Sequence, residues 1–282
     1  MLTIGQSATL ACLLEVNAPK PGNVHRGADF DDATLNDFAA SAVAIGPVME
    51  RAASQAVGQT VLDAIQATDR VTQTNTNLGI VLLFAPIATV AVEHDLEESL
   101  PNLLDSLSAR DATLVYQAVR QANPGGLDPV DEPIRRHDIH TKPPDDLIVA
   151  MRAAADRDTI AKQYVNGFQE VFQRVIPYLL QHPKLSIPDR IVHAHLQVMS
   201  QIPDTLIARK GGGDLANESA ARATAVLEAG DVMTEDYQRA LAELDFWLRS
   251  DGRRRNPGTT ADLIAAGLFV LLRENKLQVP FG

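Results

Sequence analysis

The feature that most constrains the fold is an apolar segment, Leu78 to Val92, whose sequence LGIVLLFAPIATVAV contains no charged residue. A helix that is apolar on every side lies inside a protein or inside a membrane. This segment is too short to span a bilayer and is followed at once by Glu93. It therefore predicts a buried central helix. A second apolar helix is predicted over 260–272.

The remainder of the chain shows helical periodicity. Apolar residues recur at a spacing of three or four, as Ile4, Ala8 and Ala11 do before Pro19 stops the first helix. The other predicted helices are 3–18, a helix from Asp31 or Asp32 to Gly46 that is interrupted at Gly46-Pro47 and resumes to about 56, 60–70, 96–108, 111–122, 145–181, 186–200, 218–229 and 234–250. No alternation of strands with helices and no hairpin signal is found. The sequence predicts an all-α fold, with one globular domain over residues 1–282 built around the two buried helices.

Composition limits the partners. The formal net charge of −11 argues against nucleic acid or an anionic membrane surface as the main partner, so any phosphate site must be a local basic pocket. The single cysteine, Cys12, excludes an internal disulfide and a cysteine-rich zinc site. The first residues, MLTIGQSATL, lack the basic region of a secretion signal, so we expect a cytoplasmic protein.

A stiff loop follows the first helix. Pro19, Pro21 and Gly22 cannot continue a helix, and Gly22 opens a positive φ. The loop and the residues after it carry basic, polar and acidic side chains, namely Lys20, Asn23, His25, Arg26, Asp29, Asp31 and Asp32. Cationic groups beside carboxylates are typical of a polyphosphate site with Mg²⁺. The alternative is a surface loop followed by an aspartate that caps a helix.

The polar run Thr72 to Asn77 leads directly into the first apolar helix. Because that helix is predicted to be buried, its free amide groups need partners inside the protein. The side chains of Asn75 and Asn77 could cap them, and a bound phosphate or ribose could do so as well. Both interpretations remain open from the residues alone.

Two further loops precede predicted helices. Asp204, Arg209 and Lys210 come before three glycines, and the next helix is expected to start at Asp214. Glycines before a helix expose amides to an anion, so Gly211 and Gly212 with the two cations suit a polyphosphate, although the sequence is not a Walker A motif. An ordinary turn between helices is the alternative.

The last of these loops runs from Arg253 to Asp262. Arg255 and Thr259 are candidates for binding phosphate at the start of the second buried helix. Asp262 lies one turn into that helix, where a carboxylate is costly unless it is paired or binds a metal.

The stretch from 127 to 145 is rich in proline and charge and predicts a flap or a solvated linker. Arg135 and Arg136 could close over phosphates. His137 and His140 lack the third ligand of a metal site.

Five ordered segments resemble the triphosphoribosyl-dephospho-CoA synthase family. They are Glu15 to Asp32 with PKPGNVH and GADFDD, Asn75-Thr76-Asn77-Leu78-Gly79, Asn123-Pro124-Gly125-Gly126-Leu127, Asp204 to Gly212, and Asn256 to Leu263. The resemblance implies an enzyme that transfers the triphosphoribosyl group of ATP to the 2′-hydroxyl of dephospho-CoA and releases adenine. ATP and dephospho-CoA or a related coenzyme precursor are the implied partners.

The resemblance also suggests roles for residues. An oxocarbenium-like transition state at ribose C1 needs a nearby carboxylate and a base for the acceptor hydroxyl. We expect Glu15, Asp29 and Asp204 to be the catalytic candidates. Mg²⁺ is expected on Asp29 or Asp32 together with Asp262. The expected substrate-binding residues are Lys20, Asn23, His25, Arg26, Asn75, Asn77, Arg209, Lys210, Gly211, Gly212, Arg255 and Thr259.

One departure from the family bears on the acceptor. The family's usual Asn-Thr-His-Lys run is replaced here by Asn75-Thr76-Asn77-Leu78. A related transferase of another coenzyme pathway, such as the synthesis of a pterin-type one-carbon cofactor, is therefore an alternative. A non-catalytic helical module that binds a nucleotide or a protein is a second alternative. The sequence leaves open whether the chain forms a homo-oligomer.

Overall fold

A computed structural model describes residues 1–123 and 143–279. Within them the α-helices are α1 (Ile4–Asn17), α2 (Leu35–Met49), α3 (Val57–Asp69), α4 (Leu78–Thr89), α5 (Leu96–Asp105), α6 (Ala109–Ala122), α7 (Leu147–Ala154), α8 (Thr159–Asn166), α9 (Ile176–Leu180), α10 (Ile187–Gln201), α11 (Thr205–Gly211), α12 (Gly213–Glu228), α13 (Glu235–Arg249) and α14 (Gly258–Arg273). A 3₁₀ turn (Ala52–Ser54) and a π-helical turn (Val171–Val175) complete the elements. Among the described residues there is no strand, only two isolated bridges near His25 and Phe30, so the all-α prediction is confirmed.

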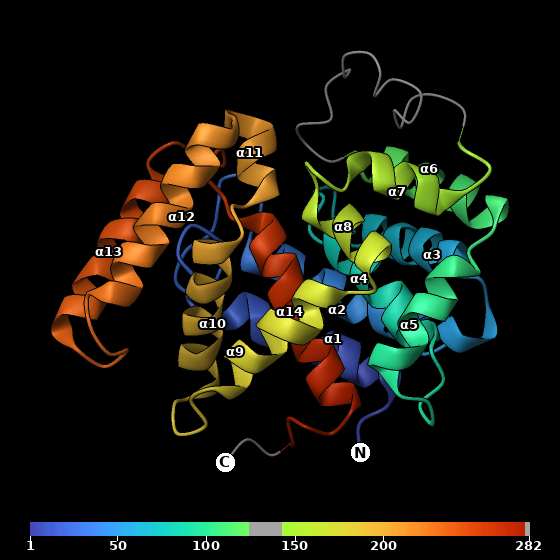
Figure 1. Cartoon of the computed structure of the whole chain (residues 1–282), viewed down its shortest axis with the longest axis horizontal. Coiled ribbons are helices and arrows are strands. Elements are labelled where there is room, and N and C mark those ends of the chain that lie inside the picture. Colours follow the sequence, from blue (N-terminus) through green and yellow to red (C-terminus); the bar gives the residue numbers. More distant parts are fainter. Residues whose placement is uncertain (124–142, 280–282) are drawn as a thin grey trace.

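The two apolar helices form the centre, as predicted. Every residue of α14 from Leu263 to Arg273 is buried, and α4 is buried along nearly its whole length. The two helices contact each other, with the rings of Phe84 and Phe269 stacked at a centroid distance of 4.4 Å. Figure 1 shows α14 running through the middle of the molecule.

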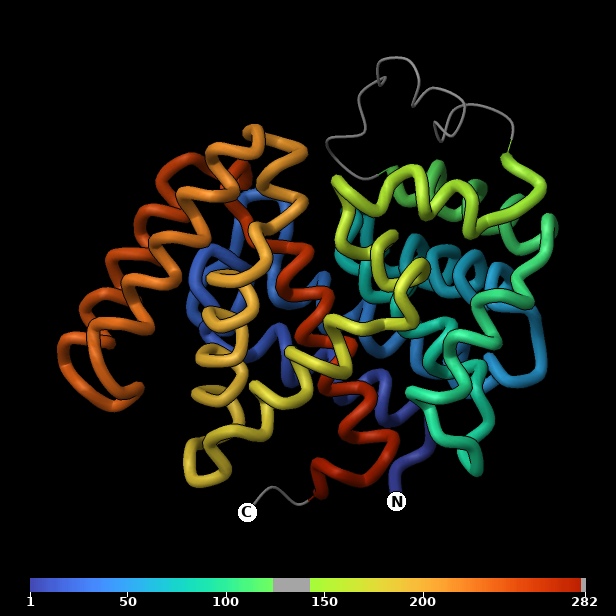
Figure 2. Tube along the Cα trace, viewed as in Figure 1, coloured from blue at the N-terminus to red at the C-terminus, as the bar shows by residue number. Residues whose placement is uncertain are grey.

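The other helices cover this centre from two sides. On one side lie α10, α12 and α13, and on the other lie α3 to α8 (Figure 1). The N-terminal helix α1 packs against both α2 and α14 (Figure 2). The first and the last helix of the chain are therefore in contact. None of the helices in the described ranges is long and apolar enough to cross a lipid bilayer.

The second helix differs from the prediction at its start and at its proline. It begins at Leu35, not after Asp31 or Asp32, because Thr34 and Asp37 form a capping box there. Pro47 does not interrupt it. The proline lies so close to the end at Met49 that only the last turn loses a backbone hydrogen bond.

Two other predictions are corrected. The region 145–181 is not continuous, because the chain breaks at Asp158, which caps α8, and at Gly167 and Phe168, which have positive φ. The segment expected to be a glycine loop is mostly the short helix α11, which ends at Gly211. Gly212, with φ of 90°, provides the sharp junction to α12.

Residues 124–142 lie outside the part of the chain that the structure describes. The expectations for Arg135, Arg136, His137 and His140 therefore remain predictions from the sequence.

Candidate active site

A cavity of about 1180 Å³ lies between the two sides of the molecule and reaches the central helices. The first residues of several helices line it, among them Leu78, Gly79 and Ile80 of α4, Thr159 of α8, Gly213 of α12, and Gly258 and Thr259 of α14. Helix N-termini carry partial positive charge and free amide groups. The amides of Gly79, Ile80 and Thr259 have no acceptor in the described part of the chain. The cavity is therefore suited to an anion.

Asp262 lines this cavity close to the N-terminus of α4. Its side chain faces the cavity and the start of α4, where a Cβ on Gly79 would lie 2.0 Å from Asp262 Oδ2. The carboxylate makes no hydrogen bond to any residue that the structure describes. Burial, followed by the charges of Glu15 and Asp204, raises the pKa of Asp262 well above its ordinary value, while Arg209 opposes this rise. An acid with so little stabilisation favours a cation or a hydrogen-bond donor from a ligand.

Gly79 makes room for Asp262, so we expect Gly79→Ala to displace the carboxylate. A methyl group at this helical position alone would stabilise α4 by about 1 kcal/mol. We expect instead a loss of turnover of about 100-fold, since a displacement of about 1 Å can cost that much. Steady-state kinetics would measure it. In an Asp262→Ala background the same change should raise Tm, and a Gly79→Ala enzyme with unchanged kcat would contradict this role.

Glu15 lines the cavity from the last turn of α1. Its Oε1 lies 2.9 Å from the ammonium nitrogen of Lys20, and both side chains are almost fully buried. Burial raises the pKa of Glu15, and Lys20 opposes that rise. Lys20 also donates to the backbone oxygens of Glu15 and Ala18. Lys20 thus lies beneath the wall and does not line the cavity, contrary to the expectation that it binds the triphosphate.

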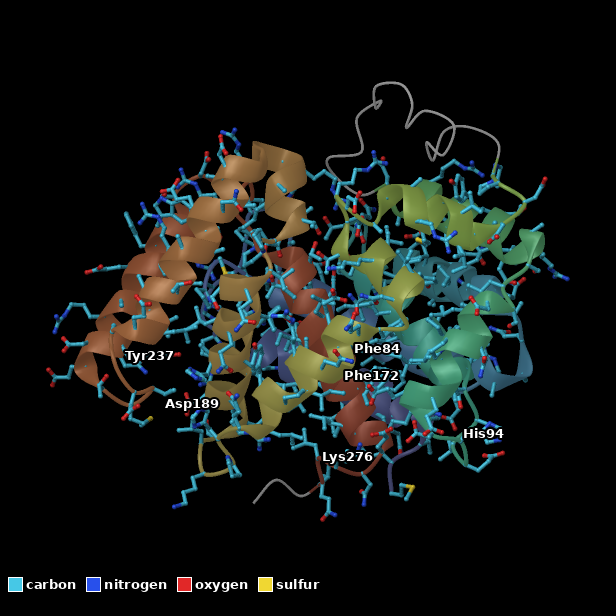
Figure 3. All side chains as sticks on the ribbon, viewed as in Figure 1. Phe84, His94, Phe172, Asp189, Tyr237 and Lys276 are labelled. Carbon is cyan, nitrogen blue, oxygen red and sulfur yellow. The ribbon has the colours of Figure 1, made fainter. Side chains whose placement is uncertain are left out.

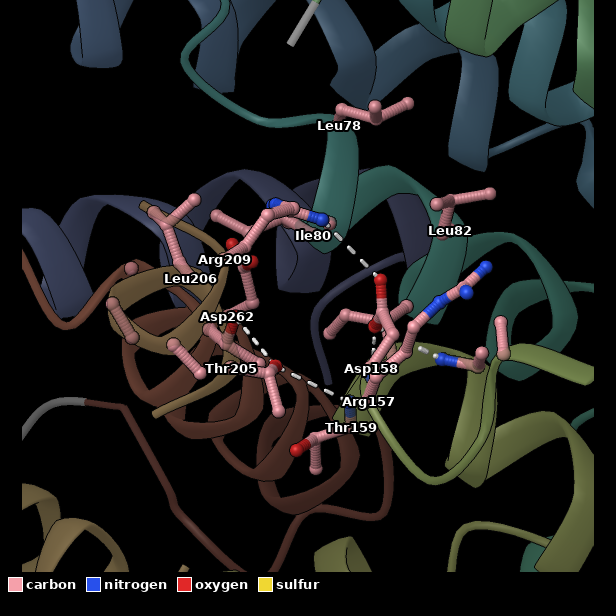
Figure 4. Close-up of a pocket in the computed structure, with 18 of the residues that line it drawn as sticks. Leu78, Ile80, Leu82, Arg157, Asp158, Thr159, Thr205, Leu206, Arg209 and Asp262 are labelled. Atoms are coloured by element: carbon pink, nitrogen blue, oxygen red, sulfur yellow. Dashed lines mark hydrogen bonds and ion pairs between the residues drawn. The ribbon is translucent and has the colours of Figure 1, made fainter. Parts of the chain in front are cut away.

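Basic side chains line one wall. Arg209 Nη1 lies 3.4 Å from Asp158 Oδ2 (Figure 4), and Lys210 Nζ donates to the backbone oxygen of Arg253 at 3.2 Å. Arg253 in turn forms an ion pair with Asp32 at 2.7 Å. Burial and the neighbouring arginines lower the pKa of Lys210. This surplus of positive charge would be relieved by bound phosphate.

The polar run before α4 both caps the helix and lines the cavity. Asn75 Oδ1 accepts a hydrogen bond from the amide of Leu78, which is the capping interpretation. Asn77 is bonded to Thr68 at 2.9 Å. Both asparagines also line the cavity, as do Asn23 and Thr259. A ligand contact by these four residues therefore remains compatible with the geometry.

Asp204 is not among the residues that line the cavity, and the geometry does not favour the catalytic role that the sequence suggested for it. Its Oδ1 accepts from the amides of Leu206 and Ile207, and its Oδ2 accepts from the amide and hydroxyl of Thr260, at 2.7 to 3.0 Å. All its acceptor positions are thereby used. It ties the start of α11 to the start of α14.

Several other candidates lie outside the cavity, namely Asp29, His25, Arg26, Gly211, Gly212 and Arg255. Asp29 is exposed and accepts a hydrogen bond from the amide of Leu35, so it supports the start of α2, whose N-cap residue is Thr34. The guanidinium of Arg255 stacks 4.3 Å from the ring centre of Trp247 and donates to the Trp247 carbonyl. His25 Nδ1 accepts from the amide of Gly27. The candidates that remain for contact with a ligand are therefore those that line the cavity.

The expected metal set is not assembled. Asp29 does not line the cavity, whereas Asp32 and Asp262 both line it, and Asp32 is paired with Arg253. In 1–123 and 143–279 no three His, Cys, Asp or Glu side chains are grouped as a metal site. Mg²⁺, however, needs only one or two carboxylates when phosphates complete its shell. Asp262 provides one such carboxylate. Asp158 is also in view (Figure 4), but its Oδ1 caps α8 and its Oδ2 is paired with Arg209.

The sequence did not point to several lining residues, among them Asp158, Arg157, Lys162 and Asn217. Asp158 was missed because 145–181 was interpreted as one continuous helical pattern. The signal that could have located it is its position before Thr159, where an aspartate typically caps a helix.

Comparisons with known proteins identify the family of the chain. A search of curated proteins found no match. The crystal structure of an Archaeoglobus fulgidus protein, provisionally described as a triphosphoribosyl-dephospho-CoA synthase, matches with a TM-score of 0.63 and 25% identity, covering 83% of this chain and 98% of that one. The family model for ATP:dephospho-CoA triphosphoribosyl transferase matches residues 1–281. The chain therefore belongs to the ATP:dephospho-CoA triphosphoribosyl transferase family.

Proposed function

We propose that the cavity binds ATP and dephospho-CoA together, and that the transfer releases adenine and depends on Mg²⁺. In this reaction the bond between ribose C1 and adenine N9 breaks, and a bond forms between C1 and the 2′-oxygen of dephospho-CoA. The proton of that hydroxyl balances the proton taken up by the departing adenine. The observation that carries the proposal is the unpaired Asp262 carboxylate at the meeting point of helix N-termini, with Glu15 beside it.

The triphosphate belongs at the basic wall. Arg209 and Lys210 in the last turn of α11, Gly213 at the start of α12, and Arg253 all line this part of the cavity. The free amides and the helix dipoles add to the side-chain charges. Together they bring positive groups to the site in a protein whose formal net charge is −11.

The donor set present fits Mg²⁺ bound together with ATP. Asp262 would hold the ion and phosphate oxygens would complete its shell, while Asp32 and Asp158 are other carboxylates that line the cavity. The ion would neutralise phosphate charge and orient the triphosphate. The neighbouring Arg209 holds Asp158 in place and competes with no oxygen of Asp262.

Glu15 is placed for the chemistry at C1. Its carboxylate lies at the cavity wall and its charge is balanced by Lys20. A fixed carboxylate in a site with little water stabilises an oxocarbenium-like centre strongly and can accept the proton of the attacking hydroxyl. No other acid on this wall combines burial with a fixed partner, within the residues described.

Release of free adenine tests the function. Purified protein should form adenine from ATP and Mg²⁺ only when dephospho-CoA is present, measured by chromatography. Adenine formed with another acceptor alone would support the related coenzyme transferase. Nucleotide binding without adenine release under any of these conditions would support the non-catalytic module and refute the proposal.

Arg209→Met should weaken ATP binding by about 10- to 100-fold, because a hydrogen-bonded charge contact with phosphate is lost. The affinity for adenosine, which has no phosphate, should be unchanged. Titration calorimetry with each ligand measures both. Arg26→Met is the matched control, since Arg26 is exposed and outside the cavity. Equal ATP affinity in the two variants would contradict the assignment.

A further inference from the structure

Lys20 is the most completely buried cation in the described part of the protein. Its side chain has no exposed surface, and its ammonium lies 2.9 Å from Glu15 Oε1. It also donates to the carbonyl oxygens of Glu15 and Ala18. Two hydrogen bonds, one ion pair and the absence of exposed surface leave the ammonium inaccessible to a ligand. Lys20 therefore acts inside the protein.

The loop that carries Lys20 is fixed from behind by α13. The amide of Gly22 donates to Asp245 Oδ1 at 2.7 Å, and Arg249 donates to the Asn23 carbonyl. Gly22 has a φ of 72° and would carry a Cβ only 2.6 Å from Leu248. A side chain there would be strained and would clash. The ammonium is thus held in place by backbone and by a second helix.

A buried lysine is costly to keep charged unless a carboxylate faces it. The carboxylate that faces Lys20 is the one on the cavity wall, and not one placed elsewhere in the core. Asp262, by contrast, has no such partner. Two acids of one cavity are therefore held differently: one is fixed by a cation behind it and one is open to the ligand.

We propose that Lys20 is a positioning residue, which orients the Glu15 carboxylate at ribose C1 and balances its charge without touching substrate. This inference rests on the proposed function for its catalytic consequence, whereas the pairing itself is testable without turnover. It predicts that the effect of Lys20 on catalysis passes entirely through Glu15.

The test is a double-mutant cycle with Lys20→Met and Glu15→Gln in the full chain. Adenine release gives kcat, and titration calorimetry gives the ATP Kd and the fraction of binding-competent protein. We expect Lys20→Met to lower kcat per competent site about 10- to 100-fold, as loss of an outer-shell partner does, with Kd changed less than twofold. In the Glu15→Gln background Lys20→Met should change kcat less than twofold.

Three results would overturn the proposal. A rise in ATP Kd of tenfold or more with unchanged kcat would make Lys20 a phosphate ligand. Equal losses of kcat in both backgrounds would show that Lys20 acts apart from Glu15. A kcat per competent site unchanged by Lys20→Met would show a merely structural role.

A stability measurement keeps the test decisive if a single variant folds poorly or the wild type releases no adenine. Each single variant leaves one buried group unpaired, so the double variant should have a higher Tm than either. A Tm loss in the double variant equal to the sum of the two single losses would refute the pairing. Lys276→Met is the control, because Lys276 pairs with Glu274 at 2.6 Å near the end of α14, away from the cavity (Figure 3).

Discussion

Replacing Asp262 with Asn should lower the kcat of adenine release about 100- to 1000-fold, because the Mg²⁺ that orients the triphosphate and neutralises its charge loses its carboxylate ligand. The carboxylate is the only lining acid that lies at the start of α4 without a protein partner, among the residues described. An amide of equal size preserves the shape and removes the negative charge. The helical circular dichroism should be unchanged.

The same substitution should stabilise the free protein. Because the pKa of Asp262 is raised on folding, its ionisation in the unfolded chain costs stability as the pH rises above about 4, the ordinary pKa of Asp. Asp262→Asn should therefore raise Tm at pH 7 more than at pH 4, measured without Mg²⁺ or nucleotide. The control is Asp189→Asn at the start of α10 (Figure 3), which should leave activity intact. An Asp262→Asn enzyme with unchanged kcat would remove this residue from the site.

The second large effect concerns stability. Asp204→Ala should destabilise the protein by about 2–4 kcal/mol, since one side chain caps α11 and also binds the first turn of α14, and each cap contributes about 1–2 kcal/mol. Chemical denaturation would measure this loss. The expectation differs from a catalytic role, in which stability would change little and turnover would be lost.

The discriminating quantity for Asp204 is activity per folded molecule. Asp204→Asn retains one acceptor oxygen and should show a smaller loss of stability than Asp204→Ala. Adenine release, divided by the fraction of protein that binds ATP, should stay within about tenfold of the wild type, because the residue acts on the helix positions. A fully folded Asp204→Asn enzyme with turnover reduced 1000-fold would restore the catalytic assignment.

The helical core could be predicted from sequence because its physical signal is local. A segment without charged residues, such as Leu78 to Val92, is expected to be buried in a globular protein. The same reasoning located α14, whose 260–272 prediction matches the buried part of Gly258–Arg273. The predicted helix boundaries were wrong where a capping residue sets the start of the helix, as Thr34 does for α2. They were also wrong where the structure has a short helix in place of a predicted loop, as in α11.

The site could be predicted only in part. The sequence placed Glu15, Asn75, Arg209 and Asp262 on loops and helix ends that should meet, and the cavity does bring them together. These segments are distant in the chain. They meet because both apolar helices are buried and their polar N-terminal ends are buried with them. The roles of individual acids did not follow, because an aspartate before a helix has the same pattern whether it caps or reacts. Asp204 caps α11, and Asp29 accepts a hydrogen bond from the first amide of α2.

Lys20 illustrates the remaining gap. A lysine between two prolines predicts a rigid cation, yet sequence does not say whether it faces the ligand or the core. The structure turns it inward, and its partner Glu15 takes the position on the cavity wall. The loop that carries Lys20 is held by α13, which is more than two hundred residues away in the chain, so the direction of the Lys20 side chain has no local signal in the sequence.

The central claim is that this one cavity joins the ribose of ATP to dephospho-CoA with the triphosphate intact. Mass spectrometry of the product formed by the wild-type protein from ATP, Mg²⁺ and dephospho-CoA tests it most directly. The account expects dephospho-CoA extended by a triphosphoribosyl group, with free adenine in equal amount and much less of both from Asp262→Asn. A product that retains adenine and has lost phosphate or diphosphate would contradict it.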